Sequence, residues 1–164
     1  MPIDLAQRLI YADAVVRHDV EAALLRYARH GVPFLTALLE LRPQLQAALD
    51  SELARISGGE VHEADPDPDL VARLPDGLCS QFLGYPVAVF GPTRTVDVLI
   101  ADPLDAHAAG EFSFHLQAPV RLIRGSLAVL TEQPDDARLD AIRRDRDECL
   151  RHVPSRFRKE VAAA

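Results

Sequence analysis

The chain has 164 residues, 48% of them hydrophobic, so it can bury a core as one compact domain or as two small ones. Its formal net charge of −7 at pH 7 opposes a sequence-independent grip on nucleic acid, which needs clustered positive charge. With six Phe, three Tyr and no Trp, the chain also lacks an aromatic platform on which the bases of a single strand could stack.

The two cysteines and the first residues of the chain indicate the cellular compartment of the protein. Cys79 and Cys149 stand far apart, without a C-x-x-C motif or a paired Cys-His spacing, which favours a reduced, cytoplasmic protein. The start Met-Pro-Ile-Asp has no basic region followed by an apolar core, so we expect no signal peptide. No apolar run approaches the roughly 18 residues that a membrane span needs.

The first third of the chain has a helical period. Its apolar residues recur on one face of successive short helices: Leu5, Leu9, Ala12, Val20, Leu24, Tyr27, Phe34, Leu38 and Leu41. Gly31 is expected to close the second helix, and Pro43 to open a helix over 43–56. Sliding the chain by 29 residues places Leu5 on Phe34. The pattern predicts a helical tandem-repeat subdomain over 1–57.

An acidic, Pro-rich linker is predicted over 58–69. Ser57-Gly58-Gly59 stops the helices, and Asp-Pro-Asp-Pro-Asp occupies 65–69. Such a charge run is typical of a solvated segment, so the subdomain boundary is placed here.

Over 70–133 the spacing of the apolar residues changes, and it predicts a small α+β domain. A short helix is expected to open at Leu74-Pro75-Asp76 and to end at Gly84. The remaining elements follow from apolar runs and turn residues: strands at 86–90, 96–101 and 119–124, and helices at 102–116 and 127–132. The first two strands should pair as a hairpin.

The stretch from Thr95 to Asp105 organises this domain. Its near-continuous apolar run is typical of a strand covered on both faces, and its Asp-Pro-x-Asp ending stops the strand and starts a helix, with Asp102 or Asp105 as the cap. We therefore predict an α+β fold: an N-terminal helical tandem unit, then a three-stranded sheet covered by helices, then a C-terminal amphipathic helix.

The last segment, 134–164, is predicted to be a charged amphipathic helix over 135–153 and a tail. Its incomplete apolar stripe is interrupted by Arg146 and consists of Leu139, Ile142, Cys149, Leu150 and Val153. The helix is therefore expected either to pack at an edge of the domain or to project from it and contact another molecule. Eight basic side chains from 138 to 159 are largely offset by acidic neighbours, which favours a salt-bridged, exposed helix.

Residues 70–132 resemble the N-terminal domain of type II secretion and type IV pilus assembly ATPases. The resemblance rests on Leu-Pro-Asp-Gly-Leu-Cys at 74–79, Tyr-Pro-Val at 85–87, Ala-Asp-Pro-Leu-Asp at 101–105, Glu-Phe at 111–112 and Ala-Pro-Val at 118–120. Upstream, the helical units at 4–30 and 33–56 resemble the tandem repeats of the MshEN arrangement in the same proteins. This resemblance implies a module that docks the ATPase onto its membrane platform.

In a subset of that family the tandem repeats bind cyclic di-GMP, through an Arg-Leu-Gly triplet, a turn glycine and a closing Gln. The corresponding residues of this chain are Asp4, Leu5, Ala6, Asp13 and Tyr27, and in the second unit Pro33, Phe34, Leu35 and Arg42. The apolar positions survive, whereas an acid replaces the Arg that would stack on guanine or pair with phosphate. We therefore expect no cyclic di-GMP binding at these degenerate positions.

The ATPase motor is missing from this sequence. A phosphate-cradling loop needs Gly-Lys-Ser/Thr, and the single Lys is Lys159. The chain is expected to be a stand-alone relative of the docking module or a piece of something longer.

Other chemistry-bearing residues favour structural roles. Asp105 and His107 are two apart on a helix and so do not face each other as an acid-base pair. His62-Glu63-x-Asp65 has the composition of a metal site but lies in the predicted linker. Ser80 and Ser113 lack a nucleophile elbow, and Cys79 falls on an apolar helix face.

The leading interpretation is a non-enzymatic protein-interaction module of a secretion, pilus or motility system, without metal, cofactor or nucleic acid. The partner surface expected on the terminal helix comprises Arg143, Arg146 and Arg151. One alternative is a cyclic di-GMP receptor with a degenerate motif. Another is a hydrolase with a dispersed site, which no nucleophile-base spacing supports.

Overall fold

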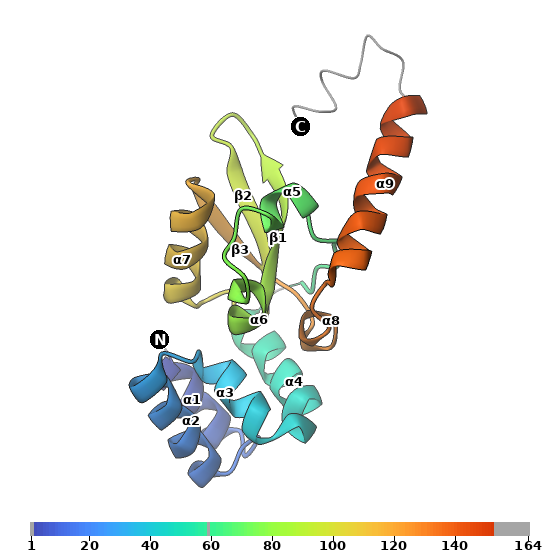
Figure 1. Cartoon of the computed structure of the whole chain (residues 1–164). Helices are drawn as coiled ribbons and strands as arrows, with labels where there is room; N and C mark the ends of the chain where they lie inside the picture. The colour runs from blue at the N-terminus through green and yellow to red at the C-terminus, as the bar shows by residue number, and fades with distance from the viewer. Residues whose placement is uncertain (1, 59, 153–164) are drawn as a thin grey trace.

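The computed structural model describes residues 2–58 and 60–152 (Figure 1). The helices are α1 (Pro2–Tyr11), α2 (Arg17–His30), α3 (Phe34–Leu41), the 3₁₀ helix η1 (Pro43–Leu45), α4 (Gln46–Ser57), α5 (Pro68–Val71), α6 (Leu78–Phe82), α7 (Ala106–Leu116), α8 (Leu127–Thr131) and α9 (Asp136–His152). The strands are β1 (Gly84–Phe90), β2 (Thr95–Ile100) and β3 (Val120–Arg124). Within the described residues, no helix is both long enough and apolar enough to cross a bilayer.

Helices α1 to α4 form a layer below the sheet in Figure 1. Helix α2 ends as expected at Gly31, whose φ of 68° lies in the left-handed region and whose N–H donates to the Tyr27 carbonyl over 3.0 Å. The helix expected over 43–56 differs at its start, because Pro43 opens one 3₁₀ turn before α4 begins at Gln46. The helical character of this segment is confirmed.

The sheet has the strand order β1-β2-β3. Strands β1 and β2 form the expected antiparallel hairpin, with a bulge between Pro86 and Ala88. Strand β3 runs parallel to β2, because α7 carries the chain back across the sheet before β3 begins. Together with the helices this confirms the α+β fold class.

Strand β2 is buried on both faces, as its apolar run indicates. Val98 and Ile100 pack on one face with Phe112 of α7. On the other face, Leu99 joins Tyr85 in a core that continues through the N-terminal helices. This shared core crosses the predicted boundary at 58–69, and the division into two subdomains stays a prediction.

The short helix before β1 differs from the prediction. It begins at Leu78 instead of near Leu74, and it ends at Phe82, so that Gly84 is the first residue of β1. A Cβ at Gly84 would lie 2.7 Å from the carbonyl oxygen of Leu99. The glycine is therefore explained by the close approach of β1 to β2, and not by a helix end.

The acidic segment 60–69 packs on the sheet more closely than a solvated linker would. The backbone N–H of His62 donates to the Arg124 carbonyl over 2.8 Å, and Pro66 and Pro68 are buried. Asp67 caps α5 by accepting hydrogen bonds from the N–H groups of Asp69 and Leu70. A Pro at the first helical position and a capping Asp thus start a helix at Pro68, inside a segment whose composition indicated a linker.

Helix α9 lies along one side of the α+β region and extends away from the N-terminal helices (Figure 1). It contacts α5, so it packs at an edge. Leu139, Ile142 and Leu150 are half-buried, whereas Cys149 is exposed, which corrects its place in the apolar stripe. Val153 and the predicted tail lie outside the described residues.

Candidate functional site

A cavity of about 500 Å³ lies where the N-terminal helices meet the α+β region. Its wall from the N-terminal helices comprises Leu5, Leu24, Tyr27, Ala28, Pro33, Phe34, Leu35 and Thr36. Its wall from the α+β region comprises Phe82, Ile100, Asp102, Asp105, Ala106 and His107. We call it the junction cavity. Its volume falls in the range of about 300–1,000 Å³ that is typical of ligand sites.

The interior wall of the junction cavity is apolar and rigid. Phe34, Phe82 and Ile100 are each buried, so the core fixes their positions. Thr36 adds a polar group, but its hydroxyl already donates to the Gln81 carbonyl over 2.7 Å and thereby joins α3 to α6. The cavity therefore presents a preformed surface for apolar groups.

Two carboxylates stand at the end of β2, on the α+β side of the cavity. Asp102 Oδ1 accepts the N–H of Leu104 over 3.0 Å in the turn that ends the strand. Asp105 Oδ1 accepts the N–H groups of His107 and Ala108 over 2.9 and 3.3 Å. Asp105 is thus the N-cap of α7, which starts at Ala106 and not at Asp102 as expected.

Burial raises the pKa of Asp102 above its ordinary value. The Leu104 N–H acts in the opposite direction, and the charge of Asp105 raises the pKa further. An opposite charge brought to this carboxylate would therefore stabilise its ionised form. Among the described residues that line the cavity there is no Lys or Arg.

His107 faces Phe82 and Glu111. Its ring meets the Phe82 ring edge-on, with centroids 5.3 Å apart, and its Nε2 lies 3.6 Å from Glu111 Oε1. Asp105 contacts the backbone of His107 and caps the helix. The prediction that Asp105 serves as a helix cap is confirmed.

The degenerate motif positions fall into two groups. Five of them line the junction cavity: Leu5, Tyr27, Pro33, Phe34 and Leu35. Asp4, Ala6, Asp13 and Arg42 are not among the lining residues. Ala6 is buried in the core, and Arg42 pairs with the buried Asp19, their Nε and Oδ2 atoms being 2.8 Å apart.

The three arginines predicted for a partner surface lie on α9, and two of them, Arg143 and Arg146, lie at the edge that contacts α5. Arg143 Nε is 3.8 Å from Asp69 Oδ1, and Arg146 Nη2 is 2.8 Å from Asp69 Oδ2. Arg151 is exposed in the last turn. Nothing observed tests their role toward a partner, which stays a prediction.

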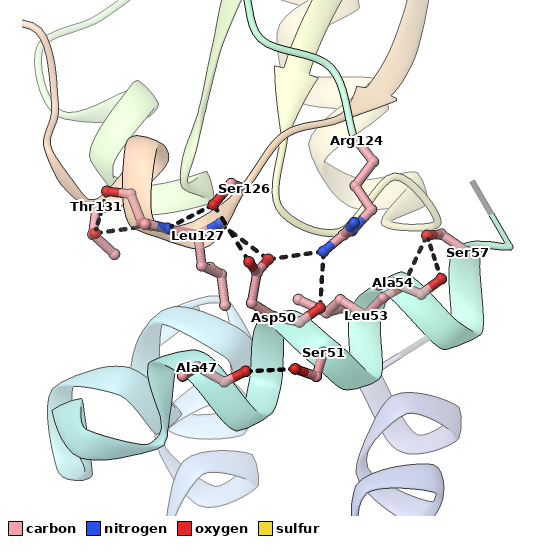
Figure 2. Close-up of polar contacts among 11 residues, drawn as sticks. Ala47, Asp50, Ser51, Leu53, Ala54, Ser57, Arg124, Ser126, Leu127 and Thr131 are labelled. Carbon is pink, nitrogen blue, oxygen red and sulfur yellow. Dashed lines mark hydrogen bonds and ion pairs between the residues drawn. The ribbon is translucent and has the colours of Figure 1, made fainter. Parts of the chain in front are cut away.

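A polar cluster that sequence reasoning missed fixes the junction from the other side (Figure 2). Arg124 at the end of β3 donates through Nη2 to the carboxylate and the carbonyl oxygen of Asp50 on α4, both over 2.8 Å. Asp50 also accepts from Ser126 Oγ and from the N–H of Leu127. No sequence signal joins Asp50 to Arg124, because the two residues are 74 positions apart.

The remaining candidate residues have structural contacts. Ser113 Oγ donates to the Ala118 carbonyl over 2.9 Å, and burial raises the pKa of Cys79 to about 11. At His62-Glu63-x-Asp65, as elsewhere in residues 2–58 and 60–152, there is no group of three or more His, Cys, Asp or Glu that could hold a metal ion.

No protein-family model and no curated protein matches the chain. Twelve chains of solved structures match this chain, and two of them are described next. The N-terminal domain of XpsE is 22% identical with a TM-score of 0.48, covering 79% of this chain and 91% of that chain. A structure of MshE with cyclic di-GMP is 20% identical with a TM-score of 0.43, covering 78% of this chain and 94% of that chain. Both are of the kind that the sequence resemblance indicated, MshEN-like and type II secretion E N-terminal domains.

Proposed function

We propose that this chain is a non-enzymatic docking module that binds a protein partner by taking an apolar side chain of that partner into the junction cavity. The observation that carries the proposal is the cavity itself, an apolar hollow between the core cluster that contains Leu5 and Phe34 and the core cluster that contains Phe82 and Ile100. A partner protein of a secretion, pilus or motility system in the cytoplasm is what the sequence resemblance suggests.

Interface energetics support an apolar anchor. Protein interfaces draw most of their binding free energy from a few large side chains inserted into well-packed pockets. The junction cavity offers such a pocket, because Phe34, Phe82 and Ile100 are held by the core and need not be ordered on binding. A preformed wall lowers the entropic cost of association.

Charge supports a basic residue beside the anchor. Asp102 and Asp105 stand at the cavity, the chain carries a formal net charge of −7, and within residues 2–58 and 60–152 no Lys or Arg lines the cavity. A Lys or Arg next to the inserted side chain would be attracted by both carboxylates. The same carboxylates repel phosphate groups.

The state of the polar residues supports binding over catalysis. Asp105 is committed to capping α7, and the His107 imidazole lies against Phe82 and near Glu111. An acid-base mechanism needs two such groups within hydrogen-bond reach of one substrate. The proposed module therefore binds a partner and catalyses no reaction itself.

The test fills the cavity without touching the core. Ala28 on α2 lines the cavity and is exposed, so Ala28→Phe should occupy the space that a partner side chain needs. The matched control is Ala48→Phe, at an exposed position of α4 outside the cavity. A partner identified by cross-linking in cells is purified and titrated calorimetrically against both variants.

The expected result is at least tenfold weaker binding by Ala28→Phe, about 1.4 kcal/mol, with Ala48→Phe equal to the wild type. Equal binding by both variants would refute the cavity as the docking site. Turnover of a small molecule by the purified chain would refute the non-enzymatic role.

The second candidate is a cyclic di-GMP receptor that keeps the fold with altered contacts. The observation that favours it is the MshE neighbour, which was solved with cyclic di-GMP and so runs against our expectation of no binding. Calorimetry of the purified chain with cyclic di-GMP decides between them. Binding at micromolar affinity, about −8 kcal/mol, would replace the docking proposal.

A further inference from the structure

The acidic motif Asp-Pro-Asp-Pro-Asp at 65–69 lies against an arginine face of α9. We define this face as Arg138, Arg143 and Arg146. Arg138 Nη2 is 3.0 Å from Asp65 Oδ1, and Arg146 Nη2 is 2.8 Å from Asp69 Oδ2. Arg143 and Arg146 reach Asp69 and Asp67 respectively over 3.8 Å. Each Asp of the motif therefore meets an arginine of the face.

The two rows run side by side. Eight residues of helix separate Arg138 from Arg146, a rise of about 12 Å at about 1.5 Å per residue. Asp65 and Asp67 lie before α5, and Asp69 lies in the first turn of α5, so the acidic row is extended only as far as Asp67. Its three carboxylates meet the arginine face along its length, because Asp65 lies at the Arg138 end and Asp67 and Asp69 lie at Arg146.

The motif is held in place, whereas α9 is held loosely. Buried Pro66 and Pro68, and the hydrogen bond from the N–H of Asp67 to the Pro86 carbonyl over 2.9 Å, anchor the acidic row to the sheet. Helix α9 has no buried residue among those described. The three side chains of the arginine face are 38–42% exposed, so salt screens their ion pairs.

We propose that the arginine face of α9 is a second docking surface, which binds an acidic segment of a partner protein in place of residues 65–69. The internal motif shows the chemistry that fits: carboxylates at alternate residues of a proline-containing segment that leads into a short helix. Binding at this surface is in competition with the internal motif, so it coincides with release of α9 from α5. The surface is separate from the junction cavity, and its test does not depend on the cavity.

The binding test uses a synthetic peptide with the sequence of residues 63–71, and a control peptide with Asn at its three Asp positions. The receptor is the full chain with Asp65→Asn, Asp67→Asn and Asp69→Asn, in which the internal competitor has lost its charges. Asn remains a good N-cap at position 67, so α5 is retained, and circular dichroism checks the fold. We expect this variant to bind the acidic peptide at least tenfold more tightly than the wild type does.

Arginine variants in the same background locate the surface. Arg143→Gln with Arg146→Gln should lose the peptide, whereas Arg144→Gln should not, because the Arg144 Nε donates to its own helix at the Asp140 carbonyl. Equal binding of the Asn control peptide, or equal loss with Arg144→Gln, overturns the proposal. Tighter binding to vesicles of phosphatidylglycerol than to the peptide assigns the face to a membrane and also overturns it.

Release of α9 is measured in the wild-type chain. Cys149 on α9 is exposed, whereas Cys79 is partly buried with its pKa raised to about 11, so a maleimide spin label at pH 7 modifies Cys149 selectively. We expect the label to become more mobile between 50 mM and 1 M NaCl, and at low salt in the triple Asn variant. An unchanged spectrum in both experiments shows that α9 stays docked and overturns the competition.

Discussion

Replacing Asp50 with Ala should destabilise the fold more than any other single polar substitution at the junction. The substitution removes the carboxylate that Arg124, Ser126 and Leu127 all contact (Figure 2). The Arg124 side chain is 3% exposed, and its Nε and Nη1 atoms have no hydrogen-bond partner among the described residues. After the substitution, one hydrogen bond to the Asp50 carbonyl oxygen would remain for a buried cation.

The expected loss follows from that geometry. Removing one partner of a buried ion pair costs about 3–5 kcal/mol, because the remaining charge is left uncompensated. Asp50 itself is 28% exposed, so water can reach the vacated position and the lower end of that range is expected. Because natural domains have free energies of unfolding of about 5–15 kcal/mol, a loss of this size would be a large fraction of the total.

Urea unfolding followed by circular dichroism measures the loss as a shift of the midpoint. Asp50→Asn serves as the milder variant, since it keeps an acceptor for Arg124 and for the N–H of Leu127. The pair of Asp50→Leu and Arg124→Met, which removes both charges, should be less destabilised than Asp50→Ala. A loss below about 1 kcal/mol for Asp50→Ala would match an exposed ion pair and refute the reasoning.

Two further predictions concern the strand end and a helix end. Burial raises the pKa of Asp102 in the folded state above its ordinary value of 3.8. The folded state therefore binds this proton more tightly than the unfolded state does. The resulting stabilisation is fully present below the unfolded pKa and is lost as the pH rises through the folded pKa. The free energy of unfolding of Asp102→Asn minus that of the wild type should therefore be larger at pH 7 than at pH 3.5. Urea titrations at the two pH values measure this difference, and an equal difference at both contradicts the prediction. Gly31→Ala should cost about 1 kcal/mol because Gly31 has a φ of 68°, and an unchanged thermal midpoint would contradict that strain.

The sequence predicts the elements of this fold well where local chemistry decides. The strand Thr95–Ile100, the N-cap at Asp105 and the helix end at Gly31 all follow from residues within a few positions of each other. The prediction is wrong for Gly84 because its role depends on the carbonyl of Leu99, which lies on the neighbouring strand. Contacts between distant segments leave no local pattern.

The same limit applies to the site. The resemblance drew attention to positions such as Leu5 and Phe34, which line the junction cavity, but apolar periodicity assigned them only to a core. The cavity lies between residues of α1 to α3 and residues at α6, the end of β2 and the start of α7, while the Asp50–Arg124 cluster ties α4 to β3 and α8. Its walls come from segments far apart in the sequence, as do the residues of the cluster, which are 74 positions apart.

The turn after α1 joins the sequence resemblance to the fold. Asp13 occupies the position of the turn glycine in the family's pattern, and it has a φ of 55° in the left-handed region. The N–H of Ala14 donates to the Leu9 carbonyl and that of Asp13 to the Ile10 carbonyl, both over 3.1 Å, which is the Schellman arrangement. The backbone of the turn is thus formed with an Asp, a residue that tolerates this conformation. At this position the resemblance describes a backbone requirement, and Asp13 meets it.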